Sequence, residues 1–158
     1  MAVPLIPIAI GAGAAATYAA IELIRRRRAQ PATQLVREAI DSVLSRYPAV
    51  PPGGRERNLY VVLLDRSVWR EKAKFREKNP HYREENRKPF FYVGETGLKP
   101  ERRFKRHKRN YQAGRGFVRD FGKRPLVGSA SVSADQAKGM EKALARELQA
   151  RDCGVWWG

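Results

Sequence analysis

The N-terminal segment combines an uncharged stretch with a basic flank. The first 21 residues carry no charged side chain, and four consecutive arginines follow at 25–28. A run of about 20 uncharged residues can cross a bilayer as a helix, and flanking arginines keep that end in the cytoplasm. We therefore predict a transmembrane helix within residues 1–28, with membrane contact through 1–24. The many alanines and glycines leave a second interpretation, a small-residue helix packed in an assembly.

Beyond this segment, the spacing of apolar residues predicts several helices. In residues 31–47, apolar positions such as Leu35, Ala39 and Val43 fall on one face, which is typical of an amphipathic helix. The Pro/Gly-rich stretch 48–54 then reads as a linker. Further helices are expected at 68–78, 100–108, 115–121 and 134–151, the last of them capped by Ser133.

Short runs rich in β-branched and aromatic residues predict three strands, at 59–64, 89–94 and 126–132. Strands and helices in this order indicate an α/β (α+β) fold, with a small three-stranded mixed or antiparallel sheet flanked by helices. The chain then divides into three parts. They are a transmembrane helix with its basic flank (1–28), an amphipathic helix and linker (29–54), and a small domain (55–158).

Charge points to a polyanionic partner. The formal net charge is +16, and the segment 55–124 alone carries 22 basic and 9 acidic residues. Such an excess favours nucleic acid or an acidic membrane surface. The single cysteine excludes a scaffold held by internal disulfides, and one cysteine with two histidines cannot supply a classical structural zinc site.

Five residues carry a possible chemistry: Tyr60, Tyr92, Arg103, His107 and Glu141. Tyr60 ends the tripeptide Asn-Leu-Tyr on the first strand, and Tyr92 opens Tyr-Val-Gly on the second. Arg103 and His107 are four residues apart on the basic helix, and Glu141 lies on the last helix. This set resembles the GIY-YIG nuclease superfamily, in particular a bacterial and phage subgroup, over about residues 59–158. Arg102 is the competing choice for the helix arginine.

The resemblance implies a role for each residue in phosphodiester hydrolysis. Glu141 would hold one divalent ion, Mg²⁺ or Mn²⁺, and Arg103 would bind the scissile phosphate. Tyr60 would be the general base, with a pKa lowered by the positive surroundings. Tyr92 and His107 would position water and phosphate.

Nucleic-acid contacts are expected around this set. Gly94 would let the backbone approach the substrate, and a group of cations would hold the phosphate backbone by charge: Arg102, Lys105, Arg106, Lys108 and Arg109. The basic insertion 66–88 contains Trp69, Phe75 and Tyr82, which would either stack on bases as a clamp or cover the sheet.

The favoured hypothesis is a membrane-tethered, metal-dependent endonuclease whose C-terminal domain is cytoplasmic or attached to a virion membrane. Its substrate is nucleic acid, with DNA favoured over RNA. One alternative is a non-catalytic nucleic-acid-binding protein on the same fold, for example in genome packaging. A second is a structural membrane protein whose basic domain binds acidic lipid.

Overall fold

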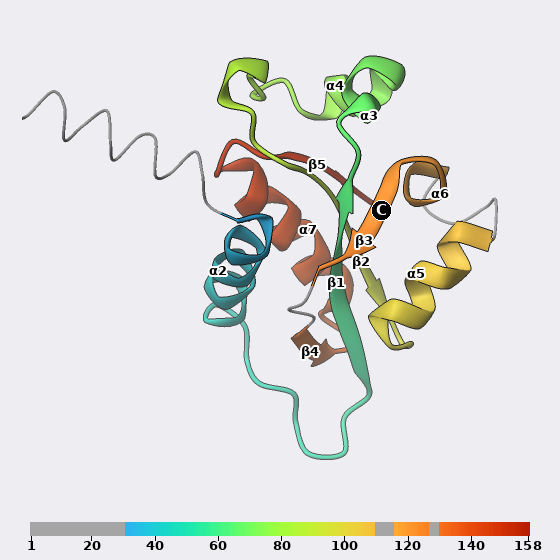
Figure 1. The fold of residues 1–158 in the computed structure, drawn as a ribbon. Coiled ribbons are helices and arrows are strands. Elements are labelled where there is room, and N and C mark those ends of the chain that lie inside the picture. Colours follow the sequence, from blue (N-terminus) through green and yellow to red (C-terminus); the bar gives the residue numbers. More distant parts are fainter. Residues whose placement is uncertain (1–30, 110–115, 127–129) are drawn as a thin grey trace, which may run out of the picture. The chain divides into compact units, whose positions relative to one another are not determined.

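The structure is a computed structural model that describes residues 31–109, 116–126 and 130–158. The described residues belong to one compact unit, residues 31–158. Its fold is α/β, with a mixed five-stranded sheet flanked by helices (Figure 1). The strands are β1 (Glu56–Leu64), β2 (Phe90–Thr96), β3 (Gly122–Pro125), β4 (Ala130–Ser133) and β5 (Gly154–Trp157). The helices are α2 (Ala32–Leu44), α3 (Ser67–Glu71), α4 (Ala73–Lys78), the 3₁₀ turn η1 (Glu84–Asn86), α5 (Pro100–Arg109), α6 (Phe117–Phe121) and α7 (Ala137–Gln149).

Strand β1 is the centre of the sheet. The order is β3-β1-β2-β5, and β4 also pairs with β1. β1 is antiparallel to β2, β3 and β4, whereas β5 runs parallel to β2. A parallel pair needs a crossover connection, and α7 lies in the segment of chain that leads into β5.

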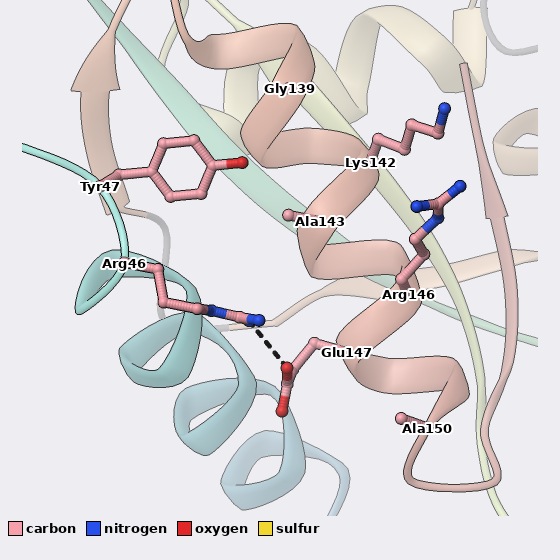
Figure 2. A pocket seen from close by; sticks show the side chains of 8 residues that line it. All are labelled: Arg46, Tyr47, Gly139, Lys142, Ala143, Arg146, Glu147 and Ala150. Atoms are coloured by element: carbon pink, nitrogen blue, oxygen red, sulfur yellow. Dashed lines mark hydrogen bonds and ion pairs between the residues drawn. The ribbon is translucent and has the colours of Figure 1, made fainter.

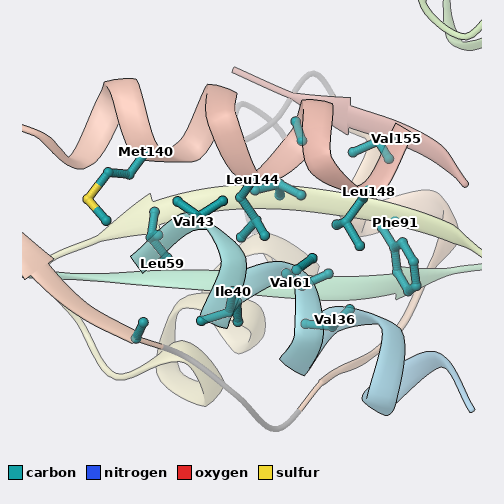
Figure 3. Close-up of a cluster of buried hydrophobic side chains, with 14 of the residues drawn as sticks. Val36, Ile40, Val43, Leu59, Val61, Phe91, Met140, Leu144, Leu148 and Val155 are labelled. Atoms are coloured by element: carbon teal, nitrogen blue, oxygen red, sulfur yellow. The ribbon is translucent and has the colours of Figure 1, made fainter. Parts of the chain in front are cut away.

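Both faces of β1 are buried. Because side chains alternate along a strand, Leu59 and Val61 face one layer while Tyr60 and Val62 face the other. The first layer consists of α2 and α7, whose apolar faces pack on the sheet in the core drawn in Figure 3. The second contains α3, α4 and α6, with Phe104 of α5 at its margin. The sheet is therefore the middle of three layers.

The predicted helix 68–78 is two short helices, α3 and α4, separated at Lys72, where the backbone is extended (φ −121°, ψ 98°). In one continuous helix, Trp69 and Phe75 would point in different directions, because six residues correspond to about 600° of rotation. The break turns both rings to the same layer, where their centroids are 6.4 Å apart in an edge-on contact.

Other boundaries differ from the sequence prediction as well. The three-strand prediction is wrong, because the sheet also contains β3 and the C-terminal β5. The strand expected at 89–94 continues to Thr96, so Gly94 lies inside it. Ser133 belongs to β4 rather than capping α7, and Gln136 is the residue that precedes the helix.

The prediction for the N-terminal segment concerns residues that the structure does not describe. Within 31–109, 116–126 and 130–158, no helix combines the length and apolar character needed to span a membrane. The transmembrane helix predicted for 1–28 lies outside the described residues.

Candidate active site

Two tyrosines from adjacent strands form the centre of the site. Tyr60 of β1 pairs in register with Gly94 of β2, and Tyr92 of β2 pairs with Val62. Both side chains point to the layer that contains α6, and their ring centroids are 6.0 Å apart. Tyr92 is two residues along β2 from Gly94, the partner of Tyr60, so the two phenols are diagonal neighbours on the same face of the sheet.

Gly94 makes room for Tyr60. A Cβ atom added at Gly94 would lie 2.8 Å from Cε1, Cζ and Oη of Tyr60. The side chain that lies close to Gly94 is therefore Tyr60 of the same protein, and the approach of a substrate to Gly94 stays a prediction. This explains why a glycine closes the Tyr-Val-Gly tripeptide.

Helix α5 adds His107 and Arg103, which share one face of the helix because they are four residues apart. His107 is fully buried, and its Nε2 atom is 2.7 Å from Oη of Tyr60. Arg103 is half-buried and interacts electrostatically with both tyrosines. Arg102 is exposed on the helix surface, so the arginine that reaches the tyrosines is Arg103.

The surroundings of Tyr60 raise its pKa. Burial is the largest cause, Tyr92 adds to it, and Arg103 offsets it only in part. The pKa of Tyr92 is likewise raised, chiefly by burial. The expected lowering of the Tyr60 pKa by positive surroundings is wrong, because removing the phenol from water outweighs a single guanidinium. At neutral pH Tyr60 is therefore a protonated phenol.

Glu141 reaches the site from the other layer. It lies on α7, and its side chain is 4% exposed. β5 pairs with β2 only as far as Val93, which leaves the following edge of β2 open. There the Glu141 carboxylate accepts a hydrogen bond from the backbone N–H of Glu95 and lies within electrostatic range of Tyr92.

The carboxylate of Glu141 already attracts a cation. Lys138 Nζ lies 3.3 Å from Oε1 and 3.4 Å from Oε2. Burial raises the pKa of Glu141 even so, and Lys138 counteracts this only in part. Nearby Glu95 is paired with Arg57. No group of three or more metal-ligating side chains occurs in the part of the chain described. One carboxylate fits a hard divalent ion that keeps most of its waters.

The basic residues predicted to hold nucleic acid lie on the outer face of α5. All five are exposed: Arg102, Lys105, Arg106, Lys108 and Arg109. Lys108 differs from the others, because its Nζ donates to the carbonyl oxygens of Arg119 (2.8 Å) and Gly122 (3.0 Å) at the end of α6. Its charge therefore stabilises a helix C-terminus as well.

The aromatic residues of the insertion cover the sheet. Phe75 and Tyr82 are 0% and 3% exposed, and Trp69 stacks on Phe90 of β2 with centroids 5.9 Å apart. Of the two interpretations of this segment, the structure favours a covering layer over a base-stacking clamp.

The insertion also holds β5, a role that the sequence analysis missed. The buried side chain of Asn79 bonds to both N–H (2.7 Å) and C=O (3.0 Å) of Val155, as a neighbouring strand would. Lys78 lies over the rings of Trp156 and Trp157. The closing Gly-Val-Trp-Trp segment, rich in β-formers, was a signal for this strand.

No known protein family, curated protein or solved structure with which the chain was compared shows significant similarity to it.

Proposed function

We propose that this domain is a metal-dependent endonuclease of the GIY-YIG type that hydrolyses phosphodiester bonds, in DNA rather than RNA. The observation that carries the proposal is the grouping of Tyr60, Tyr92, Arg103 and His107, with Glu141 at the adjacent strand edge. These residues come from four separate elements, β1, β2, α5 and α7. Their types match the needs of the reaction, namely a proton acceptor, a guanidinium for phosphate and an oxygen ligand for a cation.

Tyr60 and His107 form the proton path in this proposal. Tyr60 is protonated at neutral pH, so it accepts a proton from the attacking water only by passing its own to His107 Nε2, 2.7 Å away. Tyr92, whose ring centroid lies 5.5 Å from that of His107, positions the water. In this proposal, a relay through His107 takes the place of the directly acting phenolate base that the sequence predicted.

Arg103 and Glu141 act on the phosphate. The Arg103 guanidinium offers a planar fork to the scissile group, where negative charge grows in the transition state. Glu141 would hold the divalent ion, with Lys138 displaced from its carboxylate. When bound, Mg²⁺ or Mn²⁺ neutralises charge on the phosphate and on the leaving oxygen. The exposed cations of α5 hold the flanking backbone without reading sequence.

The proposed tether is residues 1–24, which would keep this domain at the cytoplasmic face of a membrane or at a virion membrane. The support for the tether is the uncharged stretch with its arginine flank.

Neighbouring arginines give a matched test of the site. Nicking of supercoiled plasmid with Mn²⁺ is compared for wild type, Arg103→Ala and Arg102→Ala. Loss of a transition-state contact lowers the rate about 100-fold or more, so this is expected for Arg103→Ala. Loss of one backbone contact changes affinity by less than about tenfold, which is the expectation for Arg102→Ala. Equal effects of the two variants would contradict the proposal.

A second candidate is a non-catalytic nucleic-acid-binding protein on this fold. The observation that favours it is burial, because Tyr60, His107 and Glu141 are only 1%, 0% and 3% exposed. A protein that binds DNA with salt-sensitive affinity but does not nick it, with either metal, would support this candidate.

A further inference from the structure

A basic pocket lies on the α2–α7 side of the sheet, in the layer opposite the two tyrosines. It has a volume of about 370 Å³. Lys142 and Arg146 line it from α7, with their charged ends extending away from Tyr47 (Figure 2). Arg46 and Tyr47, just past the end of α2, lie across from α7. Small residues such as Gly139 and Ala143 leave the space between them open. The pocket thus combines cations, an aromatic ring and free volume.

The charge of this pocket is only partly balanced. Among the described residues that line it, Glu147 carries the one carboxylate, which accepts hydrogen bonds from Arg46 (2.8 Å) and Arg151 (3.2 Å). Burial alone would raise the pKa of Glu147, but these hydrogen bonds outweigh it and lower the pKa. In the part of the chain that the structure describes, Lys142 and Arg146 have no side-chain hydrogen bond or ion pair. Two positive charges remain available to an anion.

Position and chemistry favour nucleic acid as the anion. Lys138, Lys142 and Arg146 follow one another at four-residue intervals, so they form a ridge along α7 that rises by about 6 Å per step. Lys138 at the start of this ridge pairs with Glu141 of the candidate active site. A chain of phosphates can follow such a ridge, and the half-buried ring of Tyr47 offers a stacking surface for an unpaired base. A lipid headgroup would use the cations but not the ring.

We propose that the pocket between α2 and α7 binds a single-stranded segment of nucleic acid, whose phosphates contact Lys142 and Arg146 and one of whose bases packs against Tyr47. The inference rests on the proposed function, because the bound segment is the substrate strand that extends from Glu141 along α7.

The test measures binding of the full chain to a fluorescent single-stranded oligonucleotide, without divalent ions, as a function of salt. Each phosphate contact to a single strand contributes about 0.7 to the salt slope, so Lys142→Gln/Arg146→Gln should lower it by about 1.4 and weaken binding about 25-fold at 0.1 M salt. The matched control is Lys74→Gln/Arg83→Gln, two exposed cations of the insertion, which should leave the slope unchanged. Tyr47→Leu should reduce the preference for single-stranded over duplex oligonucleotide.

Three results would overturn the inference. The first is an unchanged salt slope in Lys142→Gln/Arg146→Gln, and the second is an equal decrease of the slope in the control variant. The third is that Lys142→Gln/Arg146→Gln loses binding to anionic lipid vesicles but keeps its affinity for the oligonucleotide. Glu141→Gln separates this inference from the proposed function, because it should abolish nicking, while Lys142→Gln/Arg146→Gln should still lower the salt slope by about 1.4 when added to that variant. If Glu141→Gln nicks normally while Lys142→Gln/Arg146→Gln loses oligonucleotide binding, the proposed catalytic role of Glu141 is wrong, and the proposed binding of nucleic acid in the pocket still stands.

Discussion

Gly94→Ala tests the geometry of the two strands at the site. The added Cβ would lie 2.8 Å from three atoms of the Tyr60 ring, well inside the contact distance of about 3.5 Å for carbon atoms. The ring cannot move freely, because Tyr60 is 1% exposed and is bonded to His107. Overpacking of this kind costs about 1–3 kcal/mol of folding free energy.

The expected consequence is measurable in two ways. At about 4 °C per kcal/mol for a unit of this size, Gly94→Ala should lower the melting temperature by about 4–12 °C. Displacement of Tyr60 Oη from His107 Nε2 should also slow nicking strongly, even at temperatures where the variant is folded. Thermal unfolding followed by circular dichroism and a plasmid-nicking time course measure the two effects.

Gly97→Ala is the matched control. Among the residues that the structure describes, no atom lies within 4 Å of a Cβ added at Gly97, and the backbone there needs no positive φ. This variant should melt within about 2 °C of wild type and nick normally, since a surface change has little effect on stability. If Gly94→Ala behaved like Gly97→Ala, the placement of Tyr60 over Gly94 would be refuted.

Three further predictions follow from buried polar groups. Burial raises the pKa of Glu141, so its stability contribution is present below the unfolded-state pKa and is lost as pH rises through the folded-state pKa. Urea denaturation should therefore find Glu141→Gln at least as stable as wild type at about pH 8, with no gain near pH 4; a less stable variant at pH 8 contradicts this. The pKa of Tyr60 is raised above that of a free phenol, so Tyr60 should add no tyrosinate absorbance up to about pH 11, and Tyr60→Phe should match wild type over this range. If the variant showed one tyrosinate fewer than wild type below about pH 11, the raised pKa would be disproved. Asn79→Ala leaves buried groups of Val155 unpaired and should cost about 2–5 kcal/mol of unfolding free energy, whereas Asn86→Ala should change it by less than about 0.5 kcal/mol.

The strongest periodic signals predicted their elements well. The amphipathic stretch 31–47 is α2, with Leu35, Ala39 and Val43 buried as expected, and the basic helix at 100–108 is α5. These patterns are local, because a helix with one apolar face can be recognised from its own residues. The β-rich run at 59–64 was recognised as β1 for a similar reason, since both of its faces are apolar.

The remaining features depend on distant partners. β5 forms because Gly154–Trp157 adds to β2 and is held on its other edge by Asn79, and neither contact is visible in a four-residue segment. The break at Lys72 likewise reflects where Trp69 and Phe75 must lie on the sheet.

The site residues could be proposed from motif spacing, but their electrostatics could not. The local positive charge suggested a lowered pKa for Tyr60, whereas burial under α5 raises it. Burial depends on the packing of α5 against β1, which composition does not reveal. The same packing distinguishes the half-buried Arg103 from the exposed Arg102.

The central claim is that Glu141 and the tyrosine–histidine pair form a hydrolytic site. Its most direct test is the rate at which the full chain nicks supercoiled plasmid in the presence of Mn²⁺, for wild type and for Glu141→Gln. We predict metal-dependent nicking by wild type and a loss of at least about 100-fold in the variant, because the carboxylate proposed to hold the ion is gone. Equal nicking by the two proteins, or none by either, would contradict the account.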